Sequence, residues 1–112
     1  MKIQKLSLIQ RLRIPIDKFD PMKVSKQQGQ ETGTYFIEEN DQIIAQLQYT
    51  LGPNRIIINH TEVAHEFKGQ GLAQQLMQEA ISDARENKFS IVPACQFARV
   101  YFARNTESQD VL

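Results

Sequence analysis

A glycine-rich turn that runs into a helical pattern is the first stretch whose residue types and spacing suggest chemistry. The stretch FKGQGLAQQL, residues 67–76, places Gly69 and Gly71 two positions apart and has no usual polar cap where the helix begins. Glycine lets the backbone approach a ligand oxygen closely, and the first amide groups of a helix are unpaired and carry partial positive charge. The stretch therefore suits a phosphate group. A plain strand-to-helix turn is the alternative, because a Walker loop and a third glycine are both missing.

Cys95 and His60 are the side chains whose types suit group transfer. Cys95 follows Pro93 and precedes the last helical segment, where unpaired amide groups and the helix dipole would stabilise a thiolate. His60 lies on the strand that leads to the glycine turn, where a neutral imidazole could accept a proton from Cys95 or from an amine. The alternatives are a small buried thiol for Cys95 and a hydrogen bond to Glu62 for His60.

The strands that must position these groups are predicted upstream of the turn. The segments TYFIEE, IIAQLQYT and RIIINHTEV are separated by the turn-prone ND and GPN, which predicts a three-strand antiparallel meander. Strict alternation in the third strand would place Ile56, Ile58, His60 and Glu62 on one face.

Helices and one further strand are predicted downstream of the turn. Small and apolar residues at helical spacing from Leu72 predict an amphipathic helix that ends near Asn87. The segment FSIV is typical of a short buried strand, and Phe97, Val100 and Tyr101 would form the apolar face of a second, shorter helix. The final NTESQDVL is expected to be a tail. Three strands, a helix, a strand and a helix make an α+β domain.

Length and composition indicate one compact domain. The chain has 112 residues, 41% of them hydrophobic and 23% charged, with no apolar run long enough to cross a bilayer. Polar and basic residues interrupt the N-terminal MKIQKLSLIQRLRI before it could form a signal-peptide core, so a soluble, cytoplasmic protein is expected. Cys95 is the only cysteine, which excludes an intramolecular disulfide and a four-cysteine metal site. No metal is predicted.

The charges divide the chain at about residue 30. Residues 1–30 hold seven Lys/Arg against two Asp/Glu, whereas the remainder holds six against eleven. We therefore predict a basic N-terminal extension, residues 1–30, followed by a domain of residues 31–112. The extension would either lie beside the acidic domain or bind an anionic partner. A nucleic-acid module is disfavoured by the zero formal net charge and the lack of interleaved exposed aromatic residues.

Residues 60–105, from HTEVAHEFKGQGLA through VPACQFARVYFARN, resemble the acetyl-coenzyme A (acetyl-CoA) binding core of the GNAT superfamily of N-acetyltransferases. The short, single-domain Yjdj-type members are the most similar, and the resemblance runs from about Gly33 to the C-terminus. It implies the compact acyl-CoA N-acyltransferase fold, in which backbone amides of the turn hold the coenzyme pyrophosphate. The turn residues that match are Lys68, Gly69, Gln70, Gly71, Leu72 and Ala73. Lys68 replaces the usual Arg or Gln, and His65 stands where proline is common.

The resemblance also implies roles for residues on either side of the turn. The strand ending at Val63 would splay from the strand at 89–92, and the main chain of Val63 would pair with the pantetheine arm. Cys95 takes the place of an asparagine found in larger members, and in Yjdj-type proteins a cysteine there is a proposed nucleophile. Phe102 stands where a proton-donating tyrosine is common. Arg104 and Asn105 would reach the adenosine or phosphate end, or else form a solvated helix terminus.

The function implied is transfer of an acetyl group from acetyl-CoA to an unidentified amine. Two routes stay open. The amine attacks acetyl-CoA directly, or the acetyl group is transferred first to Cys95 and then to the amine. The alternative function is a coenzyme A binding or regulatory module without efficient catalysis. The segment TYFIEENDQIIAQLQYT leaves no room for the two helices that help larger members to build the acceptor site.

Overall fold

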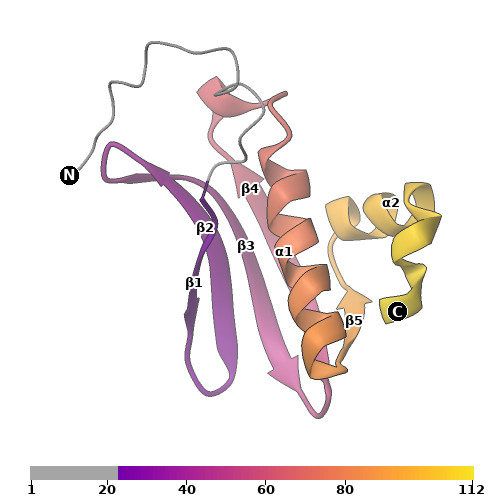
Figure 1. The fold of residues 1–112 in the computed structure, drawn as a ribbon. Helices are drawn as coiled ribbons and strands as arrows, with labels where there is room; N and C mark the ends of the chain where they lie inside the picture. The colour runs from indigo at the N-terminus through magenta and orange to yellow at the C-terminus, as the bar shows by residue number, and fades with distance from the viewer. Residues whose placement is uncertain (1–22) are drawn as a thin grey trace.

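The computed structural model describes residues 23–112, which form one sheet and two main helices (Figure 1). The elements in chain order are β1 (Ser25–Gln28), β2 (Thr32–Glu39), β3 (Gln42–Gly52), β4 (Arg55–Val63), η3 (His65–Phe67), α1 (Leu72–Asn87), β5 (Ser90–Pro93), α2 (Gln96–Arg104) and η4 (Thr106–Val111). The α+β class and the predicted order of meander, helix, strand and helix are confirmed.

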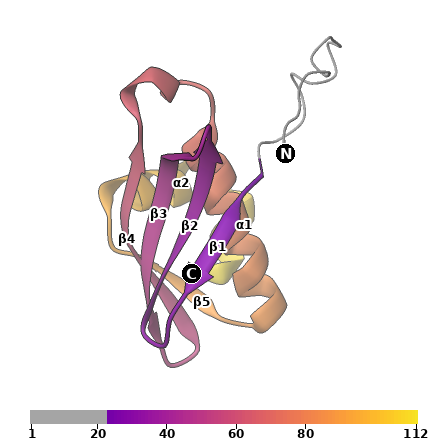
Figure 2. The same ribbon diagram turned by 90° about the vertical axis from the view of Figure 1, so that its left-hand side faces the viewer.

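The sheet is mixed and is covered on one face. Its strand order is β1-β2-β3-β4-β5, in which the first four strands are antiparallel and β5 is parallel to β4. Figure 2 shows β1–β4 in front, with α1 and α2 both behind them. The two helices thus cover the same face, here called the helix face. The opposite face of β1–β4 is called the open face.

The first strand lies within the range that the sequence predicted to be an extension. Ser25–Gln28 pairs with β2, so the antiparallel part has four strands where three were predicted. Lys26 Nζ lies 3.3 Å from Asp83 of α1, and Tyr49 of β3 donates a 2.7 Å hydrogen bond to Gln28. The division at residue 30 stays a prediction, and most of the extension lies outside the described residues.

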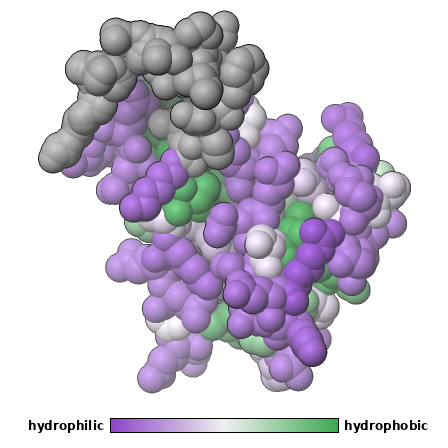
Figure 3. Space-filling view, viewed as in Figure 1, coloured by the Kyte–Doolittle hydropathy of each residue, from purple (hydrophilic) through white to green (hydrophobic). Residues whose placement is uncertain are grey.

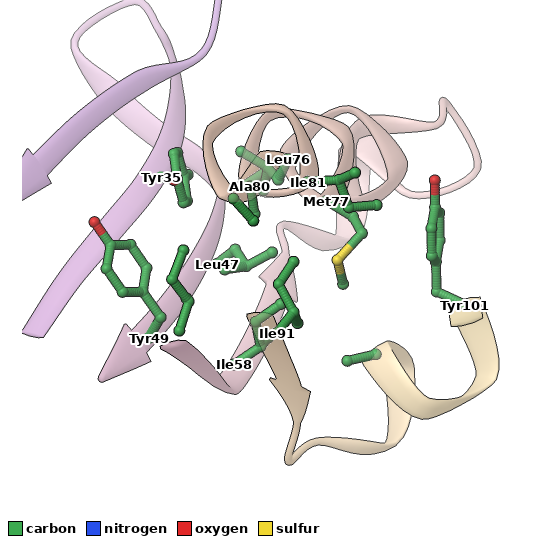
Figure 4. Packing of buried hydrophobic residues seen from close by; sticks show 14 of the residues in the cluster. Tyr35, Leu47, Tyr49, Ile58, Leu76, Met77, Ala80, Ile81, Ile91 and Tyr101 are labelled. Atoms are coloured by element: carbon green, nitrogen blue, oxygen red, sulfur yellow. The ribbon is translucent and has the colours of Figure 1, made fainter. Parts of the chain in front are cut away.

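The core fills the space between the helix face and the helices. Figure 4 shows Leu47 of β3 beneath α1, with Ile58 and Ile91 near it and the ring of Tyr49 beside Tyr35. The α1 side chains in the core are those at the predicted helical spacing, with Met77 and Ile81 widening the stripe: Leu72, Leu76, Met77, Ala80, Ile81 and Ala84. One continuous cluster therefore joins the sheet to both helices.

A β-bulge in β4 makes the predicted alternation wrong. Gln48 pairs with His60, but the next residue, Tyr49, pairs with Ile58, so Asn59 is an extra residue in β4. Paired residues point to the same face of a sheet. Because Thr61 pairs with the buried Leu47, Thr61 faces the helices, and His60 faces the open side. The bulge thus reverses the facing predicted for His60 and for the residues that follow it.

The C-terminal segment differs from its prediction in two respects. The α2 residues in the core are Ala98, Tyr101 and Phe102, whereas Val100 is 38% exposed. The predicted tail is the 3₁₀ helix η4, which buries Val111 against the core. Arg85 of α1 donates two hydrogen bonds to Asp110, at 2.8 and 3.0 Å, and fixes η4 in place.

The surface seen in Figure 3 is mainly hydrophilic, with small separate hydrophobic areas. No helix within residues 23–112 is long and apolar enough to cross a membrane.

Candidate functional site

The turn between β4 and α1 exposes backbone donors. Gly69 and Gly71 have φ angles of 82° and 80°, which other residues rarely adopt, and Gly71 caps α1 without a side-chain hydrogen bond. A Cβ atom added at Gly69 would meet no atom within 4 Å. The backbone at Gly69 therefore faces open space, and the first amide groups of α1 point outward.

The edge of β4 is open next to this turn, as the predicted splay requires. Pairing with β5 ends at Ile58 and Pro93, after which Ala94 donates a 3.0 Å hydrogen bond to the Ile58 carbonyl. Ala64 donates to the carbonyl of Ile44 on β3 at 2.7 Å. Hydrogen-bonding directions alternate along an antiparallel strand, so the N–H and C=O groups of Thr61 and Val63 point away from β3. The splay of β4 from β5 is confirmed.

One cavity of about 550 Å³ joins the open edge to the turn. Its lining combines backbone donors, one basic side chain at Lys68 and the rings of Phe67 and Phe97. The lining residues are Thr61, Glu62, Val63, Phe67, Lys68, Gly69, Gly71, Leu72, Ala73, Gln74 and Phe97. The end at the glycine turn suits an anion, and the end at Val63 suits an extended chain with hydrogen-bonding groups.

Cys95 lies beside this cavity as the N-cap residue of α2. Its Sγ atom is 3.7 Å from Oγ1 of Thr61, which lines the cavity. The side chain is partly buried against the core, and no side chain caps α2. The thiol is therefore at the border of the cavity, close to the unpaired amides of a helix start.

His60 is not brought together with Cys95. The imidazole faces the open side of the sheet, where its Nε2 lies 3.5 Å from Oε1 of Glu62 and its side chain is 55% exposed. The hydroxyl of Thr61 is the polar side-chain partner of Cys95 within the described residues. The structure thus contains the contact between His60 and Glu62 that the sequence analysis gave as the alternative role of His60.

Three other candidate residues lie outside the cavity lining. Gln70 is exposed in the turn, and Arg104 is exposed at the C-terminal end of α2. Asn105 donates a 2.8 Å hydrogen bond to the Tyr101 carbonyl. It therefore forms part of the end of α2, which was the alternative to a contact with the coenzyme. Tyr101 itself is 7% exposed and packs against Phe97, so it is a core residue.

Sequence reasoning missed five lining residues: Thr61, Glu62, Phe67, Gln74 and Phe97. Phe67 and Gln74 flank the glycine turn, so their closeness to it in the sequence could have identified them as lining residues. Thr61 could not be found by strict alternation, because the bulge at Asn59 turns it toward the helices.

Comparisons with known proteins agree with this geometry. Residues 34–111 match the family model described as GCN5-related N-acetyl-transferase. No curated protein matches the chain. The solution structure of a GCN5-like protein from Staphylococcus aureus is 29% identical, with a TM-score of 0.63 over 81% of this chain and 87% of that one.

Two crystal structures share the fold at lower identity. A ribosomal-protein-alanine N-acetyltransferase from Brucella melitensis is 16% identical with a TM-score of 0.55, over 69% of this chain and 62% of that one. A GNAT family acetyltransferase from Elizabethkingia anophelis with acetyl-CoA bound is 20% identical with a TM-score of 0.52, over 68% and 53%. The chain thus spans less than two thirds of these two proteins. The family model covers most of the chain, which belongs to the GCN5-related N-acetyltransferases.

Proposed function

We propose that this protein binds acetyl-CoA in the cavity between β4, α1 and α2 and transfers the acetyl group to an amine. The observation that carries the proposal is that the uncapped start of α1 and the open edge of β4 border the same cavity. The diphosphate would bind the amides from Gly69 to Ala73, with Lys68 adding positive charge. The pantetheine arm would pair with the main chain of Val63 as an added strand does.

The acetyl carbonyl would lie next to Thr61 and Val63. Backbone N–H groups at this edge would stabilise the negative charge that the thioester oxygen gains during attack. In direct transfer the neutral amine attacks the carbonyl carbon, the C–N bond forms and the C–S bond breaks. Coenzyme A leaves as a thiolate and takes up a proton, and the new amide loses one.

The position of Cys95 supports a second route. The thiolate of Cys95 would attack the same carbon, so that a new C–S bond forms, coenzyme A leaves, and the amine then displaces Cys95. His60 faces the other side of β4 from the Thr61 hydroxyl beside this thiol, so we assign it no proton transfer with Cys95. A coenzyme-binding module without catalysis would show coenzyme binding with neither route active.

Replacing Gly69 tests the binding site. Asn tolerates a positive φ better than other residues, so Gly69→Asn should fold while its side chain enters the open space over the turn. Loss of two backbone–phosphate hydrogen bonds should weaken coenzyme A binding about tenfold by calorimetry. The matched control is Gly29→Asn, far from the cavity lining. Unchanged affinity in folded Gly69→Asn would contradict the proposed cradle.

Intact-protein mass spectrometry with acetyl-CoA separates the two routes. Transient acetylation of wild type but not of Cys95→Ala, together with loss of amine acetylation in the variant, indicates the cysteine route. Full amine acetylation by Cys95→Ala indicates direct transfer. Coenzyme binding without acetylation of any amine would leave only the binding-module alternative.

A further inference from the structure

Glu62 borders two cavities. The first is the 550 Å³ cavity proposed for acetyl-CoA, and the second has a volume of about 190 Å³. The second is lined by the start of β3 and the end of β4: Ile43, Ile44, Ala45, Gln46, Glu62 and Ala64. Glu62 therefore lies between the two cavities and lines both of them.

The carboxylate of Glu62 faces away from the proposed thioester position. Glu62 alternates with Thr61 and Val63, which face the helices, and it pairs with Gln46 of β3. Its side chain therefore lies on the open face, whereas the bound donor would follow the helix side and the edge of β4. A group held by this carboxylate reaches the donor only around the open edge of β4.

The second cavity combines an oriented carboxylate with an apolar wall. Gln46 donates a 3.4 Å hydrogen bond to Oε1 of Glu62, and His60 Nε2 lies 3.5 Å from the same oxygen. The Glu62 side chain is 62% exposed, so its charge is accessible to a ligand. Ile43, which is 51% exposed, and Ala64 supply apolar surface beside it. This combination matches an ammonium group on an alkyl chain.

The direction of Glu62 shows which ammonium it would hold. The nitrogen that attacks the thioester must be uncharged, and a carboxylate beside it would favour the unreactive ammonium form. Because Glu62 points to the other side of β4, it suits a different, non-reacting charge. Resting on the proposed acetyl transfer, we propose that the acceptor is an alkyl amine with a second ammonium group, and that Glu62 binds this second group.

The test compares two amines that have the same carbon chain, 1,4-diaminobutane and 1-aminobutane. An exposed ion pair contributes up to about 1 kcal/mol, so wild type should favour the diamine in kcat/KM by about three- to fivefold. Glu62→Gln removes the charge and should abolish this preference. The matched control is Glu66→Gln, an exposed carboxylate that lines neither cavity and should retain the preference.

Failure of this inference is distinguishable from failure of the proposed function. Equal kcat/KM for the two amines in wild type, or the same preference in Glu62→Gln, would overturn the role of Glu62. Acetylation of aniline, an uncharged aromatic amine, with neither alkyl amine used would overturn the acceptor class while acetyl transfer stands. Absence of acetyl-CoA binding in calorimetry would contradict the proposed function itself.

Discussion

At Gly33 the backbone of β2 passes directly beneath the ring of Tyr49. A Cβ atom at Gly33 would lie 2.2 Å from the ring and hydroxyl of Tyr49, which is 1% exposed and bonded to Gln28. The ring cannot move away without breaking that hydrogen bond and displacing core neighbours. A single absent methyl group therefore permits the close packing of β2 and β3 at this point.

We expect Gly33→Ala to lower the free energy of unfolding by about 1–3 kcal/mol, because overpacking a filled core strains it. The control is Gly29→Ala, where the nearest atom to an added Cβ lies at 3.8 Å, and it should change stability by less than about 0.5 kcal/mol. Urea denaturation of both variants measures the difference. Equal stability of the two would show that Tyr49 relocates freely.

Single residues also mark where sequence reasoning succeeds. Gly69 and Gly71 were identified from a local pattern, a glycine turn before a helix, whereas Lys68 and Val63 were identified from the family resemblance; all four line the cavity. Phe97 and Thr61 come from segments distant in sequence, and only the tertiary fold brings them to the same cavity.

Among the elements, β1 is held by polar contacts as well as by its ladder. Tyr35 of β2 donates a 2.7 Å hydrogen bond to Asp83, and Lys26 of β1 contacts the same carboxylate oxygen. Burial, and next the hydrogen bond to Asp83, raise the pKa of Tyr35 above its ordinary value of 10.0. Asp83 thereby joins β1, β2 and α1.

This contact predicts a loss of stability in alkali. Above about pH 10 the unfolded chain has lost the Tyr35 proton that the folded protein keeps, so the free energy of unfolding falls as pH rises. The slope from Tyr35 is at most about 1.4 kcal/mol per pH unit. Urea denaturation from pH 9 to 11 should show a shallower decline in Tyr35→Phe. Parallel curves for wild type and variant would refute the assignment.

The elements differ in how far local pattern predicts them. Helix α1 ends at Asn87 as predicted, since its apolar spacing is regular over several turns. In β4 the alternation fails at Asn59, because a bulge depends on pairing with β3 and leaves no periodic signal. In α2 two apolar stripes compete, and packing against β4, β5 and η4 selects the one with Ala98 and Phe102.

On the scale of the whole molecule, residues 23–112 cover one face of the sheet with helices, and the N-terminal edge of the sheet adds polar contacts that contribute to stability. Strand β1 forms that edge, and its Gln28 and Lys26 bond to β3 and α1. The sequence showed no strand there, because SKQQ lacks the β-branched and aromatic residues that mark strands.

Two truncations test where the domain begins. A chain starting at Lys23 keeps β1 and should retain cooperative unfolding and coenzyme binding. A chain starting at Glu31 lacks β1 and should lose at least about 2 kcal/mol, since the hydrogen-bond partner of the buried Tyr49 hydroxyl, the Lys26–Asp83 ion pair and a ladder are removed. Equal stability by urea denaturation would support a domain boundary at residue 30.

The extra residue at Asn59 has a consequence for how such a sequence can diverge. Removal of Asn59 alone would leave a regular strand in which His60 still faces outward and Thr61 and Val63 still face the helices. Removal of Thr61 or Glu62 would instead exchange the facing of every side chain beyond it in β4. Alignments of related chains should therefore tolerate a one-residue gap at positions 59–60 and exclude one at positions 61–62.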